Sequence, residues 1–284
     1  MRAMDGVLAR APAKINLVLR VGGRRPDGYH DVVSLMARVD VADTLTLAPA
    51  ARTVVDCPGL EGGDTLVTRA LQAFTDAVAP GVAPDGFHAV VVKRIPAGAG
   101  LGGGSSDAAA ALRAANRLCG EPLSSADLHA LAATIGSDVP FFLGPPSAIA
   151  RGRGELVEPG PALPPVGVVL AFPGRPLATR DVYEAYQPVV ANVEPAADAI
   201  PSRIGSLVEL ADLVANDLAP VAEELEPACR ELRLALTARG AAAASVTGSG
   251  SAVFGLFADL AAAADASARL PGATWAEAAT LSAS

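Results

Sequence analysis

Residues 96–106, PAGAGLGGGSS, have the composition of a loop that binds phosphate. Glycines leave the backbone free to adopt positive φ, and they let backbone amides approach a ligand closely. The loop runs into a predicted helix, Asp107–Leu118, with Ser105 and Ser106 as its expected N-cap, and a helix N-terminus favours an anion. A flexible surface linker would not run from a buried strand straight into an alanine-rich helix. We therefore predict phosphate binding by Pro96, Ala97, Gly98, Ala99, Gly100, Leu101, Gly102, Gly103, Gly104, Ser105 and Ser106.

Two common phosphate-binding patterns do not fit this loop. The Walker loop has a Lys after its glycines, whereas Asp107 stands here where a basic group would help. Residues 98–103 match the GxGxxG fingerprint of dinucleotide-binding folds, but residues 94–96 separate them from the preceding strand. Glu121 follows a helix, where the fingerprint requires the end of a second strand. An oxidoreductase with a dinucleotide cofactor is therefore the weakest alternative.

The elements that position this loop are predicted from hydrophobic periodicity. The segment AKINLVLRV alternates, which predicts a strand with Lys14 and Asn16 on one face. Further strands are predicted at 31–41, 43–49, 87–95 and 167–174, and helices at 66–78, at 124–136 with Asp127 completing a capping box, and over most of 203–239. Gly and Pro between 144 and 165 indicate hairpin turns or a domain crossing. Because helices and strands do not alternate regularly, we predict an α+β fold in two lobes.

The composition is that of an acidic globular protein. Of the 284 residues, 51% are hydrophobic and 18% are charged, which excludes intrinsic disorder. The formal net charge of −8 argues against non-specific nucleic-acid binding. Cys57, Cys119 and Cys229 are too widely spaced to support a disulfide framework or a zinc site. We find no stretch typical of a signal peptide or a membrane span, and we expect a soluble cytoplasmic protein with no membrane partner.

Three segments together resemble the motifs of a known enzyme family. PAKINLVL at 12–19, PAGAGLGGGSSDAAAAL at 96–112 and VTGSGSAVFGLF at 246–257 resemble, in order and spacing, the three motifs of the GHMP kinases. RPDGYH at 25–30 and GSDVPFFL at 136–143 are similar to the branch of these kinases that acts on a cytidylyl sugar alcohol. The resemblance covers nearly the whole chain.

The resemblance implies a two-lobed GHMP-kinase-like fold with the active site in a cleft between the lobes. Residues 1–155 would form an N-terminal ATP-binding lobe with the glycine loop, and residues 156–284 a C-terminal lobe that contributes to substrate binding. The implied reaction is ATP-dependent phosphorylation of the 2-hydroxyl of 4-diphosphocytidyl-2-C-methyl-D-erythritol, a step of the non-mevalonate isoprenoid pathway. ATP and Mg²⁺ are the implied cofactors, and the cytidylyl small molecule is the implied partner.

The same resemblance gives catalytic roles to Asp138 and Lys14. Asp138 follows a predicted helix end and precedes Pro140, and it matches the residue that takes the proton of the substrate hydroxyl. Lys14 would hold Asp138 ionised and stabilise charge on the transferred phosphoryl group. Without the family match, a turn aspartate and a strand lysine that reaches to solvent would be the ordinary interpretations.

The resemblance also assigns residues to the cytidylyl substrate: Asn16, Tyr29, His30, Thr179 and Tyr183. Tyr29 and Tyr183 would stack on the two faces of cytosine, and His30 would hydrogen-bond its edge. Because the chain has 3 tyrosines, each is informative.

Several segments keep two interpretations. Thr247–Ser251 either presents amides to phosphates or forms a plain turn before a strand, and Asn216–Asp217 is either structural or substrate-facing. Magnesium ligands stay open among Ser105, Ser106, the phosphates and water. Relatives often carry Asn-Leu where this chain has Thr65–Leu66, so the resemblance leaves one nucleoside contact open.

Two other functions stay open. One is a GHMP kinase for mevalonate or homoserine, against which the DGYH segment argues. The other is a non-catalytic nucleotide-binding protein, which would need the loop but not both Lys14 and Asp138.

Overall fold

The computed structural model describes residues 6–58, 65–187 and 200–282, and at Thr65 it describes the backbone alone. The chain forms two compact units that are interleaved along the sequence. Unit 1 takes the chain up to Ala13, Ala42–Ile95 and Gly102–Gly144, and unit 2 takes Lys14–Val41, Pro96–Leu101 and the chain from Pro145 onwards. Two long strands and the glycine loop contribute residues to both units. The division into lobes at residue 155 stays a prediction.

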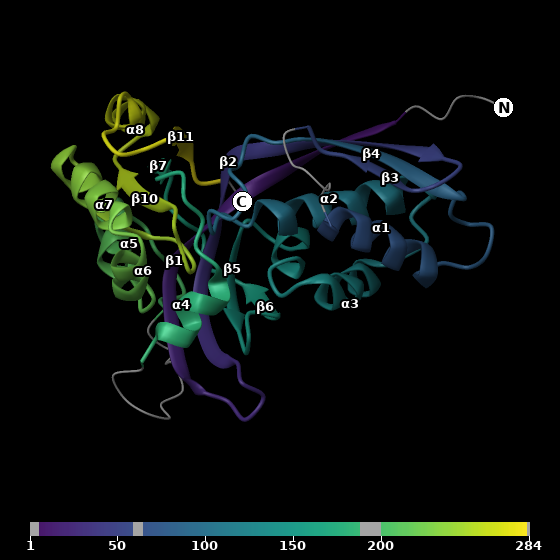
Figure 1. Cartoon of the computed structure of the whole chain (residues 1–284), viewed down its shortest axis with the longest axis horizontal. Helices are drawn as coiled ribbons and strands as arrows, with labels where there is room; N and C mark the ends of the chain where they lie inside the picture. Colours follow the sequence, from purple (N-terminus) through teal and green to yellow (C-terminus); the bar gives the residue numbers. More distant parts are fainter. Residues whose placement is uncertain (1–5, 59–64, 188–199, 283–284) are drawn as a thin grey trace. The chain divides into compact units, whose positions relative to one another are not determined.

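Unit 1 consists of helices packed against a group of paired strands. Its elements are the C-terminal part of β2 (His30–Ala50), β3 (Val54–Asp56), α1 (Thr65–Ala77), β4 (Gly86–Val92), α2 (Gly103–Leu118), α3 (Ser125–Ile135) and the short 3-10 helix η1 (Pro140–Leu143). β4 pairs antiparallel with β2 and parallel with β3. In Figure 1, α1, α2 and α3 lie on one side of these strands, and α1 packs along α2.

The core of unit 1 fixes the position of α2. Residues 108–111 of this helix are alanines and all are buried, so α1 can approach α2 closely. Phe74 of α1 meets Phe87 of β4 edge to face, with ring centroids 6.2 Å apart. The N-terminus of α2, where the glycine loop ends, is therefore supported by a packed apolar core.

Unit 2 contains two groups of paired strands. The first has the order β6-β5-β2-β1-β8, formed with β1 (Val7–Arg24), β5 (Ser147–Arg151), β6 (Leu156–Pro159) and β8 (Ala215–Asn216). The second is an antiparallel sheet in the order β11-β7-β10-β9, formed by β7 (Gly167–Phe172), β9 (Ala243–Val246), β10 (Val253–Phe257) and β11 (Trp275–Thr280). The helices of this unit are α4 (Thr179–Ala185), α5 (Leu207–Leu213), α6 (Ala219–Leu225), α7 (Ala228–Ala238) and α8 (Leu260–Ser267).

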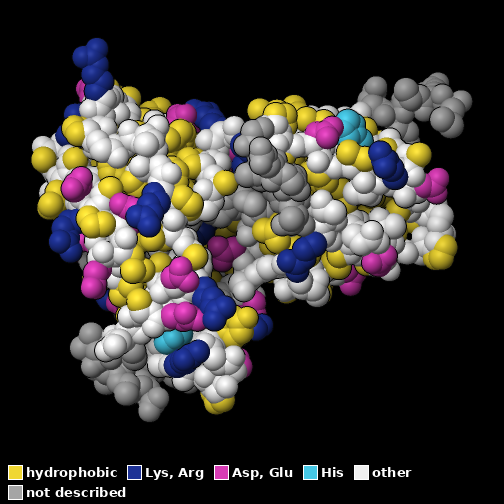
Figure 2. Space-filling model, viewed as in Figure 1, with side chains coloured by type: hydrophobic (Ala, Val, Ile, Leu, Met, Phe, Trp, Pro, Cys, Tyr) yellow, Lys and Arg dark blue, Asp and Glu magenta, His cyan; other side chains and the backbone are white. Residues whose placement is uncertain are grey.

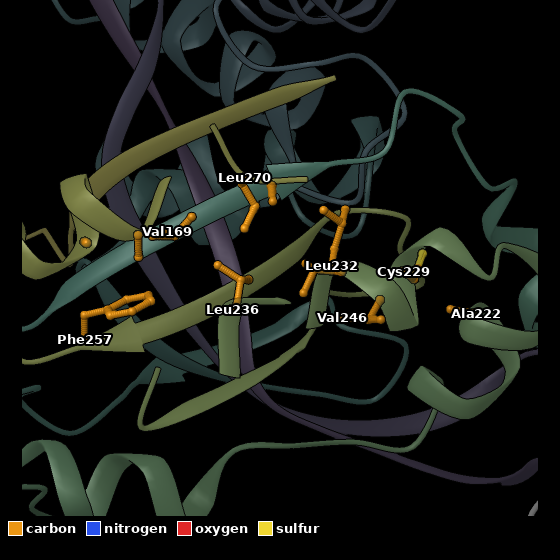
Figure 3. Close-up of a cluster of buried hydrophobic side chains, with 12 residues drawn as sticks. Val169, Ala222, Cys229, Leu232, Leu236, Val246, Phe257 and Leu270 are labelled. Atoms are coloured by element: carbon orange, nitrogen blue, oxygen red, sulfur yellow. The ribbon is translucent and has the colours of Figure 1, made fainter. Parts of the chain in front are cut away.

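An apolar cluster joins the second sheet of unit 2 to its helices (Figure 3). Leu232 and Leu236 of α7 are four residues apart and so lie on one face of the helix, which packs on β9 and β10. Cys229 is completely buried in the same cluster, and burial raises the pKa of its thiol to about 12. This cysteine is thus a packing residue and carries no reactive thiolate at neutral pH.

Most predicted elements are confirmed, but two predicted strands are one. Residues 31–41 and 43–49 belong to the continuous strand β2, since Ala42 introduces no turn. The first part of β2 pairs with β5 and the last part with β4, so different strands form the backbone hydrogen bonds of its two halves. The Gly- and Pro-rich segment at 144–165 contains the hairpin of β5 and β6, as one of the two interpretations predicted.

The predicted start of the helix after the glycine loop is wrong by one turn. α2 begins at Gly103 rather than Asp107, and Ser105 and Ser106 lie inside its first turn instead of capping it. Its N-cap is Gly102, which has φ 72°, a left-handed conformation that glycine adopts without a Cβ clash. Tertiary packing overrides the low helix propensity of glycine here. The second predicted cap is confirmed, because Ser124 and Asp127 form a capping box on α3 and the helix ends at Gly136.

Acidic and basic side chains are interspersed over the face shown in Figure 2. Some form exposed ion pairs, such as Arg180 with Glu184 at 2.7 Å on α4. Water screens such pairs, so they contribute little to stability. Among the residues that the structure describes, no helix combines the length and the apolar character needed to cross a bilayer.

Gly167 is the position in unit 2 where a side chain fits least. A Cβ there would lie 1.9 Å from the backbone oxygen of Asp259, the N-cap of α8, so a methyl group must push α8 away from β7. We expect Gly167→Ala to lower the free energy of unfolding by about 3 kcal/mol. Gly205→Ala is the control, because its Cβ would meet only a side-chain oxygen of Glu209 at 3.7 Å. Denaturant unfolding measures both, and equal stabilities would contradict this packing.

Candidate active site

The second half of the glycine loop ends in a set of helix N–H groups in unit 1, on residues that are partly exposed. Ser106 N donates to Gly102 O at 2.9 Å, which is the first bond of the α2 ladder. The N–H groups of Gly103, Gly104 and Ser105 precede this bond, so the helix itself cannot use them. Together with the helix dipole they can bind an anion.

A lysine that the sequence analysis did not single out stands behind these N–H groups. Lys93, just past the end of β4, donates from Nζ to Asp43 Oδ2 at 2.6 Å and to Asp107 Oδ2 at 2.5 Å. A Cβ built on Gly103 would lie 3.2 Å from this Nζ, so the ammonium lies against the start of α2. Burial disfavours the charged form of Lys93, but Asp107 and Asp43 outweigh it and hold its pKa above the ordinary value.

Asp43 links this cluster to the chain that enters the loop. Its side chain is completely buried, and Oδ1 accepts hydrogen bonds from the backbone N–H groups of Arg94 and Ile95. The carboxylate therefore holds the exit of β4, while the Lys93 ammonium ties it to α2. The residues are 50 positions apart in sequence, and no spacing signal could have revealed the pair.

The first half of the glycine loop belongs to unit 2 and is held by its carbonyls. Leu101 O accepts from Lys14 N and Ala99 O accepts from Ala252 N, each at 2.9 Å. Gly100 has φ 85°, and a Cβ there would lie 2.7 Å from Thr247 O. Only glycine allows this approach, so residues 96–101 are fixed between β1 and the turn at 247–251.

Lys14 and Asn16 form a buried network on β1. Lys14 is 4% exposed, and its Nζ donates to Asn16 Oδ1 at 2.6 Å, which confirms that the two side chains share a face. Asn16 Nδ2 donates to Ser34 Oγ at 2.7 Å, and Asn16 N donates to Thr247 Oγ1 at 3.0 Å. Asn16, predicted to bind substrate, thus holds the Lys14 ammonium in place.

Asp138 lies on the turn between α3 and η1 in unit 1. It is half-buried, and the hydrogen bond from Val139 N to Gly136 O, 3.1 Å long, closes the turn around it. Pro140 then begins η1 and restricts the backbone further. Lys14 belongs to unit 2, so the two predicted catalytic residues are described in separate units.

The predicted substrate residues of unit 2 include an aromatic cluster around His30. The His30 ring lies 5.6 Å from the Tyr183 ring and 5.9 Å from the Tyr186 ring. Tyr186, which the sequence analysis missed although it lies three residues after Tyr183, donates from its hydroxyl to Val21 O at 3.1 Å. Tyr29 is 56% exposed, and the Arg153 guanidinium lies 5.1 Å from its ring centre.

Two further positions are fixed by hydrogen bonds. His30 Nδ1 lies 2.9 Å from Gly22 O, and because a carbonyl only accepts, this nitrogen carries the proton. In the neutral ring Nε2 is then an acceptor. Thr179, the first residue of α4, lies with Oγ1 3.0 Å from Ser249 Oγ in the turn at 247–251.

The described residues contain no group of three or more His, Cys, Asp or Glu side chains arranged to hold a metal ion. Of the two serines considered as ligands, Ser106 is completely buried and Ser105 is partly exposed. Mg²⁺ commonly binds through nucleotide phosphates and water with few protein ligands, and the partly exposed Ser105 hydroxyl at the start of α2 fits that mode.

The sequence matches two family models, described as GHMP kinases N terminal domain over residues 65–144 and GHMP kinases C terminal over residues 196–277. A 4-diphosphocytidyl-2-C-methyl-D-erythritol kinase of Geobacter metallireducens is 39% identical over 260 residues, which cover 90% of each chain. The enzyme of that name from Pelotomaculum thermopropionicum is 40% identical over 271 residues and 93% of each chain.

Solved structures extend this similarity to the fold. A crystal structure of 4-(cytidine 5'-diphospho)-2C-methyl-D-erythritol kinase matches with a TM-score of 0.80 and 37% identity, covering 98% of this chain and 100% of the other. An L. major mevalonate kinase, 17% identical, matches with a TM-score of 0.71, covering 100% of this chain and 99% of the other. The second likeness concerns the fold alone.

Replacing Lys93 tests the ion cluster under the glycine loop. Lys93→Met leaves the buried carboxylates of Asp43 and Asp107 without their shared cation, and we expect it to lower the free energy of unfolding by about 3–5 kcal/mol. Because the folded-state pKa of Lys93 is raised, its contribution is complete below the ordinary value of 10.5 and is lost as pH rises through the folded-state pKa. Arg180→Met, which breaks an exposed pair, should leave the melting temperature nearly unchanged. If the two variants lowered the melting temperature equally, the ion cluster would not stabilise the fold more than an exposed ion pair does.

Proposed function

Because this chain belongs to the GHMP kinases and, among them, to the 4-diphosphocytidyl-2-C-methyl-D-erythritol kinases, we propose that it phosphorylates the 2-hydroxyl of 4-diphosphocytidyl-2-C-methyl-D-erythritol with ATP. The product would feed the non-mevalonate route to isoprenoids. Relatives about 40% identical over nine-tenths of the chain support this choice of acceptor.

The buried Lys14 is the structural observation that carries the proposal. A Cβ on Gly248 would lie 3.4 Å from Lys14 Nζ and also 3.4 Å from Gly100 O, so the ammonium and the glycine loop meet at one turn. A positive charge with restricted access to water stabilises charge on a transferred phosphoryl group far better than an exposed one. A protein that only binds nucleotide would not need a lysine held in this way.

Phosphoryl transfer itself requires mainly positioning and electrostatic stabilisation. The N–H groups of residues 103–105 bind the phosphates of ATP, and Lys14 stabilises the charge that develops during transfer. Asp138 takes the proton of the acceptor hydroxyl as its oxygen bonds to the γ-phosphorus of ATP, while the bond from that phosphorus to the β,γ-bridging oxygen breaks and ADP leaves. Mg²⁺ bound with ATP would neutralise phosphate charge, and the partly exposed Ser105 Oγ would join its ligands. The cleft between lobes stays a prediction.

The cluster around His30 fits a cytosine ring. Tyr183 provides an aromatic face beside His30, and Tyr29 is exposed and able to provide a second one. His30 Nε2, an acceptor in the neutral ring, matches the amino group of cytosine and not the carbonyl oxygen that uracil carries at the same position. The pocket would therefore favour cytidylyl over uridylyl acceptors.

Asp138→Asn tests the proton acceptor. The amide keeps the shape of the side chain but cannot take a proton, so we expect kcat to fall about 10²- to 10⁴-fold with ATP affinity nearly unchanged. Asp127→Asn, in the first turn of the neighbouring α3, is the matched control and should keep its kcat. The assay offers ATP and Mg²⁺ with the cytidylyl substrate, free methylerythritol, mevalonate or homoserine. If the Asp138→Asn variant turned over at the wild-type rate, Asp138 would not be the proton acceptor. If the wild type preferred another acceptor, the proposed substrate would be wrong.

Tyr183→Ala tests the cytosine pocket. Stacking on a base contributes about 1–3 kcal/mol, so we expect KM for the cytidylyl substrate to rise about ten- to a hundredfold while KM for ATP changes little. Tyr183→Phe, which keeps the ring, should behave like wild type, and Tyr29→Ala measures the second face. Steady-state kinetics with each substrate varied in turn decides the matter, and an equal rise in both KM values would rule out the pocket.

A further inference from the structure

The side chain of Asn216 uses both of its donor hydrogens on the turn at 247–251. Nδ2 donates to Val246 O and to Gly248 O, each at 2.8 Å, and Oδ1 accepts from Leu218 N at 2.9 Å. A primary amide has two N–H donors, and here both bind carbonyls on either side of Thr247. Of the two interpretations of this segment, the hydrogen bonds favour the structural one, because no donor is left for a substrate.

The turn that Asn216 holds is in direct contact with the Lys14 network. Thr247 Oγ1 accepts from Asn16 N at 3.0 Å and donates to Asn16 Oδ1 at 3.3 Å, and Asn16 Oδ1 also accepts from Lys14 Nζ at 2.6 Å. The same turn touches the glycine loop, since a Cβ on Gly100 would clash with Thr247 O. The position of Thr247 therefore determines where the Lys14 ammonium sits relative to the loop.

The backbone of Asn216 is anchored independently of its side chain. β8 pairs in parallel with β1, with Leu19 opposite Asn216, and Asp217 accepts from Val21 N at 2.9 Å. Asp217 also pairs with Arg20 at 2.9 Å. These bonds fix β8 to β1, the strand that carries Lys14. The Asn216 amide therefore sets the distance between β1 and the turn at 247–251.

We infer that Asn216 is a positioning residue for phosphoryl transfer, which acts through Thr247 and Asn16 on the Lys14 ammonium. The inference rests on the proposed kinase activity but not on the identity of the acceptor. An asparagine is required because an aspartate of the same shape would set a carboxylate against two carbonyl oxygens at hydrogen-bond distance. The side chain would then repel the turn that it now holds.

Asn216→Asp is the test variant, and its kinetics should differ from those of a purely structural change. A displacement of about 1 Å at a reacting centre lowers rates about a hundredfold, so we expect kcat to fall by about that factor with both KM values within about twofold of wild type. In a Lys14→Met background the same change should lower kcat by less than about twofold, because the group it positions is gone. Single-turnover transfer from labelled ATP, with whichever acceptor wild type phosphorylates, gives all four rates.

The control is Asn116→Asp in unit 1. Asn116 also uses its amide to bridge backbone groups, with bonds to Leu123 N and O at 3.0 Å, at the far end of α2 from the glycine loop. It should lose thermal stability and keep its kcat. If Asn216→Asp does not fold, Thr247→Val breaks the same relay at the next residue and should give the same kcat loss and the same absence of effect in Lys14→Met.

Three results would overturn the inference: an unchanged kcat in the folded variant, equal losses in the presence and absence of Lys14, or the same kcat loss in Asn116→Asp. A wild-type enzyme that phosphorylates a different acceptor would overturn the proposed substrate. The inference would still stand if Asn216→Asp lowers kcat in the presence of Lys14 and not in the Lys14→Met background. A wild-type protein that phosphorylates no acceptor would overturn both.

Discussion

The Lys14 ammonium is 4% exposed, and a buried charge is unstable unless protein groups replace the water it has lost. Much of unit 2 around the turn at 247–251 follows from this requirement. Asn16 binds the ammonium and is itself held by Ser34 and Thr247. The segments that meet at Lys14 are therefore linked by a continuous set of hydrogen bonds. A change in any one of these bonds alters the position of the Lys14 ammonium.

Close packing of backbones imposes a second constraint on the same region. Gly100 and Gly248 allow the loop and the turn to lie in contact, which brings amides and the ammonium into a space that side chains would otherwise fill. In unit 1 the Asp43 and Lys93 pair performs a comparable task at the other half of the loop, since it ties the exit of β4 to the start of α2. The first half of the loop is thus held by backbone hydrogen bonds beside the buried Lys14, and the start of α2 by the Lys93 ion cluster.

Predictions from sequence were most accurate where the signal was local. The capping box of Ser124 and Asp127, the strand face shared by Lys14 and Asn16, and the helix predicted at 66–78 are set by residues a few positions apart. All three are present. The start of α2 was placed one turn late, because a run of glycines and serines has low helix propensity and only tertiary packing makes it helical. The roles of the site residues rest on motif resemblance and stay predictions.

The sequence by itself determined the fold class and the family, because these depend on periodicity and on contiguous motifs. Phosphate binding by the glycine loop stays a prediction. It could not reveal that Lys93 pairs with Asp43, that Tyr186 packs on His30, or that Asn216 holds the turn beside Thr247. Those contacts join residues 30 to 156 positions apart, such as Asn216 with Val246 and His30 with Tyr186. Only the tertiary structure decides them, since a hydrogen bond between distant residues depends on how strands pair and helices pack and leaves no periodic signal in the chain.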